Sequence, residues 1–177
     1  DLATDNDSGQ GTLETSVGRL NELLDQLGPL NDEIGRLESN LFIDKQANDL
    51  RDDRMQIIGE IQKLVDVDIE EFDNGRVSVY IGDRTLIDGT GYPASYIHKL
   101  EVQMPSPATE SAHQVPTLHW QDAYDGEELV LNSGNYGSIK GIMDSREYTT
   151  NLMDELFVYA QSIAGVVNDI LQTGTYP

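Results

Sequence analysis

Apolar side chains in the first third of the chain recur with a helical period. They are spaced alternately four and three residues apart, and seven of the nine positions are apolar: Leu13, Val17, Leu20, Leu24, Leu27, Asn31, Ile34, Glu38 and Leu41. This spacing predicts an amphipathic helix whose heptad seam is interrupted at two polar positions. Gly28-Pro29 lies inside the seam. Because proline removes a backbone donor and clashes with the preceding turn, we expect a kink or break there.

A second helical segment follows residues 42–47, which contain neither glycine nor proline. The side chains of Asn48 and Asp49 can accept hydrogen bonds from the free amides of a first turn, so they predict a helix start. Helical spacing then continues to about Val65 through Leu50, Ile57, Ile61 and Leu64.

The apolar period changes to two after residue 66. Residues 77–81 alternate most clearly, and a turn signal, Asp73-Asn74-Gly75, precedes them. Gly82-Asp83 leads to residues 85–87, which predicts a β-hairpin. Further strands are predicted at residues 96–102, 117–120 and 127–131, with a loop over 105–116.

The chain returns to four-three spacing near its end. Gly137 and Ser138 open this last helix, the repeat runs from Ile142 to Ile170, and Gly174 ends it. Leu152, Tyr159 and Val166 widen the apolar stripe, so the helix is expected to bury a broad face.

These elements predict an α+β fold, an antiparallel helical bundle or coiled-coil rod with a small antiparallel β-rich insert hanging from one end. The expected organisation is a flexible end over 1–12, helical rod segments over 13–66, the β-rich insert over 67–133, the closing helix of the rod over 134–174 and a tail over 175–177. Apolar heptad positions more often form an intramolecular core than a groove for a partner, and both readings stay open here.

Charge narrows the possible partners. The chain has 11 Lys and Arg against 32 Asp and Glu, a formal net charge of −21, so contacts with nucleic-acid phosphates or anionic membranes are disfavoured. It has no cysteine, which excludes thiol chemistry, disulfides and Cys-based metal sites. No apolar run of membrane-spanning length and no signal-peptide pattern is present, so we expect either a cytoplasmic protein, a removed signal, or an export route that needs none.

Candidate chemistry is sparse. His98, His113 and His119 lack the spacing of a zinc motif, and Asp5 to Gly9 fails the calcium-loop pattern because Glu14 is one position from the required place. We predict no catalytic residue, no cofactor and no metal. Two alternatives remain: an acidic coiled-coil adaptor or chaperone-like module that binds basic partners, and a metal-dependent enzyme using the histidines.

Four stretches carry a family resemblance. They are LNDEI at 30–34 with ANDLRDDR at 47–54, VSVYIG at 77–82 with LIDG at 86–89, GSIKGIMDSR at 137–146, and IAGVVNDILQTG at 163–174. In this order and spacing they resemble the flagellar hook-associated protein 1 family, which joins the bacterial hook to the filament. Asp83 and Leu171 depart from the family pattern, and the resemblance does not extend to residues 90–133.

The resemblance implies a middle fragment of a non-enzymatic junction protein, without the terminal segments needed for polymerisation. It implies export through the flagellar type III apparatus to an extracellular site. The implied partners are the hook protein and the second hook–filament junction protein, with an export chaperone contacting segments absent here.

The motif residues are given structural roles on the same basis. Asn48 and Asp49 would cap a helix, Arg54 and Arg146 would pair with carboxylates near helix ends, and Asn168 would form a local hydrogen bond. Leu50, Gly137 and Gly141 complete the set of motif positions.

Overall fold

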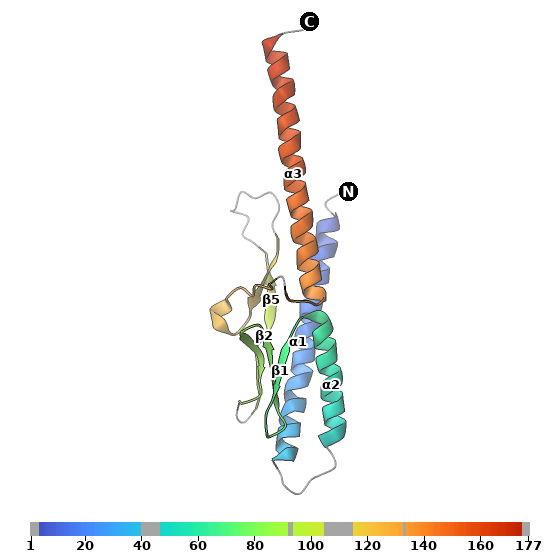
Figure 1. The fold of residues 1–177 in the computed structure, drawn as a ribbon, viewed down its shortest axis with the longest axis vertical. Helices are drawn as coiled ribbons and strands as arrows, with labels where there is room; N and C mark the ends of the chain where they lie inside the picture. The colour runs from blue at the N-terminus through green and yellow to red at the C-terminus, as the bar shows by residue number, and fades with distance from the viewer. Residues whose placement is uncertain (1–3, 40–46, 92–93, 105–114, 133, 175–177) are drawn as a thin grey trace.

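The computed structural model describes residues 4–39, 47–91, 94–104, 115–132 and 134–174. Three helices form an elongated molecule: α1 (Thr4–Glu38), α2 (Ala47–Leu64) and α3 (Ser138–Thr173). α1 and α2 lie side by side, and α3 runs along the first part of α1 before extending beyond it (Figure 1). α1 begins at Thr4, so residues 4–12 are helical where a flexible end was expected.

The break expected at Gly28-Pro29 does not occur, because α1 continues through Pro29 to Glu38. Pro29 lies on the exposed side of the helix, and so does Asp25, whose carbonyl loses its helical partner there. Water can therefore satisfy that carbonyl. Leu27 and Asn31 are fully buried on the opposite side, and their packing holds the helix on both sides of the proline.

Within the described ranges, six strands form two antiparallel sheets. The first has the order β1 (Asp68–Glu71), β2 (Val77–Ile81), β3 (Arg84–Asp88) and β4 (Tyr96–Ile97), and the second pairs β5 (Leu100–Gln103) with β6 (Thr117–Trp120). The predicted turns at 73–75 and 82–83 connect β1 to β2 and β2 to β3, with Ile69 opposite Val79 and Ile81 opposite Arg84. The local turn and alternation signals therefore predicted this hairpin correctly.

The strand expected over 96–102 is divided between the two sheets. The His98 N–H still donates to the Leu86 carbonyl at 2.8 Å, whereas the carbonyl of the following residue, Lys99, accepts from the Gln121 N–H at 2.9 Å. The chain thus changes sheets between these two residues. Residues 127–131 form no strand and contribute one isolated bridge, between Glu128 and His119.

Both sheets pack along the side of α1, and one hydrophobic core joins them to the helices. The expectation of an insert hanging from one end was therefore wrong (Figure 1). Lateral packing buries the apolar strand residues that face α1 along the length of the helix. The largest fully buried side chain is Trp120, and the core also contains Leu13, Leu20, Leu24, Leu27, Ile61, Val79, Leu86, Ile87, Leu100 and Leu118.

Tyr124, in a 3-10 turn (Tyr124–Gly126), joins the two sheets. Its hydroxyl accepts a 2.9 Å hydrogen bond from the Thr85 N–H of β3, and its ring lies 4.8 Å from the Trp120 ring of β6. The Arg84 guanidinium stacks 4.5 Å above the same ring. One aromatic side chain thereby holds the two sheets in fixed relative positions.

Candidate functional site

Two asparagines on α1 hold the sheets against the helix. The Asn31 side chain donates to the Val77 carbonyl at 2.9 Å and accepts from the Val77 N–H at 2.7 Å. Asn21 makes the same pair of bonds to Leu100, at 2.8 and 3.1 Å. Each amide therefore satisfies both backbone polar groups of one strand residue, and this sets the position of each sheet along α1.

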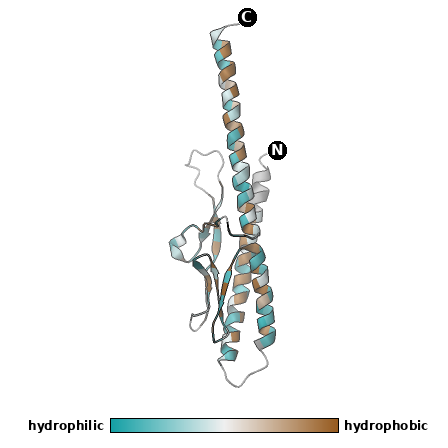
Figure 2. Cartoon of the chain, viewed as in Figure 1, coloured by the Kyte–Doolittle hydropathy of each residue, from teal (hydrophilic) through white to brown (hydrophobic). Residues whose placement is uncertain are grey.

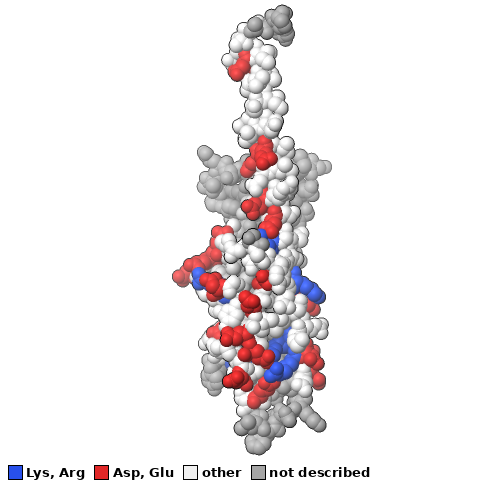
Figure 3. Space-filling model, viewed as in Figure 1, with Lys and Arg blue, Asp and Glu red and all other residues white. Residues whose placement is uncertain are grey.

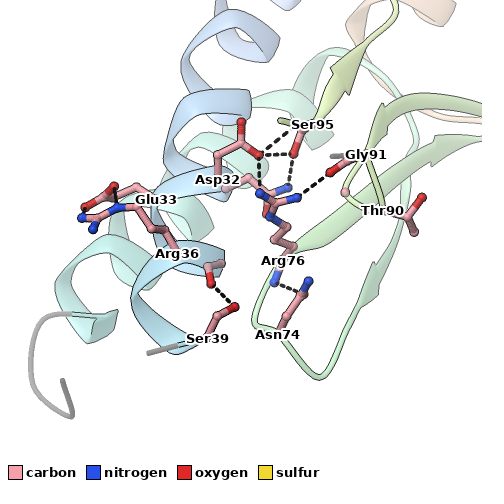
Figure 4. A network of polar contacts seen from close by, with 12 residues as sticks. Asp32, Glu33, Arg36, Ser39, Asn74, Arg76, Thr90, Gly91 and Ser95 are labelled. Atoms are coloured by element: carbon pink, nitrogen blue, oxygen red, sulfur yellow. Dashed lines mark hydrogen bonds and ion pairs between the residues drawn. The ribbon is translucent and has the colours of Figure 1, made fainter. Parts of the chain in front are cut away.

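A polar network extends this attachment (Figure 4), and Asn31 joins it by donating to the Ser95 hydroxyl at 3.0 Å. Asp32 on α1 accepts from the Ser95 N–H and hydroxyl, both at 2.8 Å. Arg76 lies 3.4 Å from the same carboxylate and donates to the Gly91 carbonyl at 2.6 Å. The network ties α1 to both ends of the β2–β4 region, since Arg76 precedes β2 and Ser95 precedes β4.

A second polar cluster joins the end of α1 to α2 and β1. Arg51 donates to both oxygens of Glu38 at 2.7 Å and to Glu71 at 2.8 Å. Arg54, only 4% exposed, donates to Glu71 at 3.0 Å and to the Gly75 carbonyl. The hydrogen bonds from Arg51 hold the pKa of Glu38 below its ordinary value.

The predicted motif residues of α2 have different surroundings. Asn48 and Asp49 lie exposed in the first turn, Leu50 is half-buried and Arg54 is buried. Arg54 pairs with Glu71, a carboxylate at the end of β1 rather than at a helix end. Capping by Asn48 and Asp49 stays a prediction.

The motif residues of α3 separate in the same way. Gly137, at φ 114°, precedes the helix, and a Cβ there would lie 2.6 Å from the Leu64 carbonyl oxygen, so only glycine allows α2 and α3 to approach. Gly141 is exposed, and a Cβ there would meet nothing within 4 Å. Burial lowers the pKa of the half-buried Arg146, and the nearby carboxylate of Glu14 on α1 acts in the opposite direction. Asn168 is exposed, and its local hydrogen bond stays a prediction.

The outer half of α3 exposes a continuous apolar face. Its large side chains are between 38% and 72% exposed: Leu152, Met153, Leu156, Phe157, Tyr159, Ile163, Val166, Val167, Ile170 and Leu171. At 3.6 residues per turn these positions cover about half of the helix circumference. Hydrophobic residues recur along this whole part of the helix (Figure 2). The expectation that this helix buries a broad face was therefore wrong for the described chain, where Ile139 is the only buried residue of α3.

Charge is distributed unevenly over the same surface. Carboxylates cover much of the visible face of the helical and sheet region, whereas the outer part of α3 shows few (Figure 3). Between residues 152 and 173 the charged residues are Asp154, Glu155 and Asp169. Asp154 and Asp169 lie on the arc opposite the apolar face, whereas Glu155 borders that face beside Val166, so the centre of the face carries no charge.

The histidines have no catalytic arrangement in the described ranges. His119 bonds to the Thr117 hydroxyl at 3.0 Å and to the Gly126 carbonyl at 2.9 Å, and His98 packs 5.7 Å from the Tyr124 ring. His113 lies outside the described residues. Among residues 4–39, 47–91, 94–104, 115–132 and 134–174, no group of three or more His, Cys, Asp or Glu could hold a metal ion. None of the helices described has the length and apolar character needed to cross a bilayer.

Sequence reasoning missed the residues that position the sheets, namely Asn21, Asn31, Asp32 and Arg76. One signal was available. Asn31 occupies a seam position that is otherwise apolar, and a polar residue at such a position requires a buried hydrogen-bond partner. The identity of that partner, the backbone of Val77, could not be found from local spacing.

The geometry defines an elongated α+β structural module whose polar groups attach one element to another. Over residues 1–176 the chain matches the family described as the flagellar hook-associated protein FlgK helical domain, and it belongs to that family. Flagellar hook-associated protein 1 of Salmonella typhimurium is 31% identical over 147 residues, which cover 80% of this chain and 25% of that protein. The protein of the same name from Escherichia coli K12 is 27% identical over 128 residues, 70% of this chain and 22% of that protein.

The chain thus spans about a quarter of the length of these curated relatives. The relatives carry the name of a hook-associated component of the flagellum, and the family is one of structural proteins rather than enzymes.

Proposed function

We propose that this chain is the helical module of a structural protein that joins the hook and the filament of the bacterial flagellum. The family match over residues 1–176 carries the proposal. The four sequence stretches quoted above are consistent with it, and they fall on α1–α2, the β2–β3 hairpin and both ends of α3.

The module acts by shape rather than by catalysis. No buried side-chain nitrogen or oxygen in the described part of the chain lacks a hydrogen-bond partner. The polar residues that are buried, Asn31, Arg54 and Ser78, all bond to backbone or side-chain groups of other elements. Such fully satisfied networks rigidify a fold.

The outer apolar face of α3 supports the coiled-coil rod. The four-three spacing is unbroken from Ile142 to Ile170, while the described residues bury only the beginning of the helix. An exposed apolar face of this extent marks an interaction site. In the assembled flagellar protein, helices outside these 177 residues pack on it and complete the rod.

The partners follow from the same proposal. The module would lie outside the cell between the hook protein and the second hook–filament junction protein, after export through the flagellar type III apparatus. An export chaperone would contact segments other than these. The alternative of an acidic adaptor for basic partners has less support. It rests on the acidic composition and the heptads alone, whereas the structural role rests on the family to which the chain belongs.

Electron microscopy of cells lacking the corresponding gene tests the proposal. We expect hooks without filaments, and filament protein released into the medium. Reintroducing the intact gene should restore filaments and swimming. Cells that keep normal filaments without the gene would refute the junction role, whatever the fold of the module.

A further inference from the structure

The tight turn between β1 and β2 contains a reactive dipeptide. Asn74-Gly75 is the only Asn-Gly pair in the 177 residues. Asn74 is exposed, and Gly75 adopts a φ of 77°, a conformation that glycine reaches without strain. Because glycine has no side chain, nothing attached to its Cα shields the Gly75 backbone nitrogen from the Asn74 side chain.

One hydrogen bond of the turn orients the Asn74 side chain. The Asn74 side-chain oxygen accepts from the Arg76 N–H at 3.0 Å (Figure 4). When the Asn74 side-chain oxygen bonds to the Arg76 N–H, the side-chain carbonyl carbon of Asn74 is brought toward the nitrogen between them, that of Gly75. The Arg76 N–H also stabilises negative charge developing on that oxygen, as an oxyanion-hole donor does.

We propose that Asn74 is a site of spontaneous deamidation, with water as the co-reactant. The Gly75 nitrogen attacks the Asn74 side-chain carbon, a nitrogen–carbon bond forms, and the amide nitrogen leaves as ammonia with the proton from Gly75. Water then opens the resulting succinimide at either carbonyl. The products are aspartate and isoaspartate, and each adds one negative charge to a chain of net charge −21.

The turn itself sets the rate. The Gly75 N–H donates to the Phe72 carbonyl at 2.8 Å, and the Gly75 carbonyl accepts from buried Arg54. Brief local opening at the exposed Asp73 and Asn74 frees the nitrogen for attack. Deamidation therefore reports how firmly the polar cluster of Glu38, Arg51 and Arg54 holds the turn.

Isoaspartate changes the turn between β1 and β2 more than aspartate does. It routes the backbone through the former side chain and lengthens the turn by one atom. The Phe72 N–H to Arg76 carbonyl bond, 2.8 Å long, closes this turn, and Arg54 is anchored on its Gly75 carbonyl. Lengthening the turn pulls both bonds out of alignment, whereas aspartate keeps the backbone path.

Peptide mass spectrometry of the purified protein, aged in mildly alkaline buffer at physiological temperature, tests the site. We expect the mass gain of an amide-to-acid change at Asn74 at least about tenfold faster than at Asn151, an exposed asparagine inside α3 that precedes leucine. Asn74→Ser should show no gain at this position. Equal rates at Asn74 and Asn151 would overturn the assignment.

Thermal melting of the separated aged fractions tests the consequence. The isoaspartate fraction should melt below fresh protein, and Asn74→Asp should melt close to it. Glu38→Gln weakens the polar cluster that holds the turn against α1, so it should accelerate the mass gain at Asn74. An isoaspartate fraction that melts like fresh protein would overturn the structural effect while leaving the site assigned.

Discussion

The Asn31 side chain on α1 replaces a neighbouring strand for Val77, because it bonds to both the N–H and the carbonyl of that residue within 2.9 Å. Val77 is the first residue of β2 and is buried. Without Asn31, its N–H and its carbonyl would both lack a hydrogen-bond partner. A helix side chain thus determines where a sheet starts. The same arrangement recurs between Asn21 and Leu100.

Asn31→Ala should destabilise the protein strongly. It leaves the N–H and carbonyl of Val77 buried without partners, and each unsatisfied group costs about 1–3 kcal/mol, so we expect a loss of about 2–6 kcal/mol in the free energy of unfolding. Denaturant titration measures it. Asn21→Ala is the matched comparison, and it should cost less because Asn21 is only half-buried. Equal, small effects at both positions would contradict the proposed role of the Asn31 side chain as a clamp on the backbone of Val77.

Gly28→Ala should lower the melting temperature although glycine is a poor helix former. A Cβ at Gly28 would lie 2.6 Å from the Cδ1 atom of Ile97, whose strand packs against this part of α1. The expected gain of about 1 kcal/mol in helix propensity is then outweighed by the clash.

The control for this prediction is Gly18→Ala, where a Cβ meets nothing within 4 Å and the melting temperature should rise. Adding Ile97→Ala to Gly28→Ala should recover part of the loss, because it removes the clashing atom. If Gly28→Ala melts above the unchanged protein, the close approach of α1 and β4 is not needed.

Glu38→Gln should weaken the protein at neutral pH and have progressively less effect in acid. Arg51 lowers the pKa of Glu38 below its ordinary value of 4.5, so the charged pair contributes stability above that value. The contribution is lost as the pH falls through the lowered folded-state pKa. Unfolding free energies of both proteins, measured across this range, should therefore converge at low pH.

Glu33→Gln provides the comparison for that experiment. Its partner Arg36 lies three residues along the same exposed surface of α1, and this hydrogen bond also lowers the pKa of Glu33. Water screens such a pair, so the substitution should change stability little at any pH. An effect at Glu33 as large as that at Glu38 would show that the buried cluster has no special role.

Leu156→Ser combined with Ile163→Ser should leave the folding of the purified chain nearly unchanged. Both side chains are 62% exposed on the outer face of α3, and exposed substitutions usually fall within about 0.5 kcal/mol. In cells, the same changes in the intact protein should impair filament attachment and swimming, since the proposed rod needs this face covered.

The matched control replaces polar residues of the opposite arc, Gln161→Ala with Gln172→Ala, and should leave swimming normal. Normal swimming with the serine variants would mean that the apolar face is not buried in the assembled protein. Loss of folding of the purified chain would instead mean that the face contributes to its core.

The chemistry of individual residues was predictable from sequence only where it acts locally. Gly174 was expected to end α3, and it does so in the left-handed conformation at φ 61°. Asp73-Asn74-Gly75 and Gly82-Asp83 were expected to be turns, and both connect paired strands. Pro29 was misjudged because its cost depends on which side of α1 faces water, and that side is set by distant strands.

The sequence by itself determined the three helices, the first hairpin and the family, because periodicity, turn residues and motif order are properties of neighbouring positions. Only the tertiary structure decided that Asn31 is a clamp, that residues 96–102 divide between two sheets and that the sheets lie along α1. The clamp depends on Val77, 46 residues from Asn31, and its counterpart on Leu100, 79 residues from Asn21. The division between sheets depends on Leu86 as the partner of His98 and on Gln121 as the partner of Lys99. The tertiary structure also decided that the apolar seam of α1 is buried while the similar seam of α3 is exposed. Burial depends on which surfaces pack together, and the spacing of residues along one helix does not determine that.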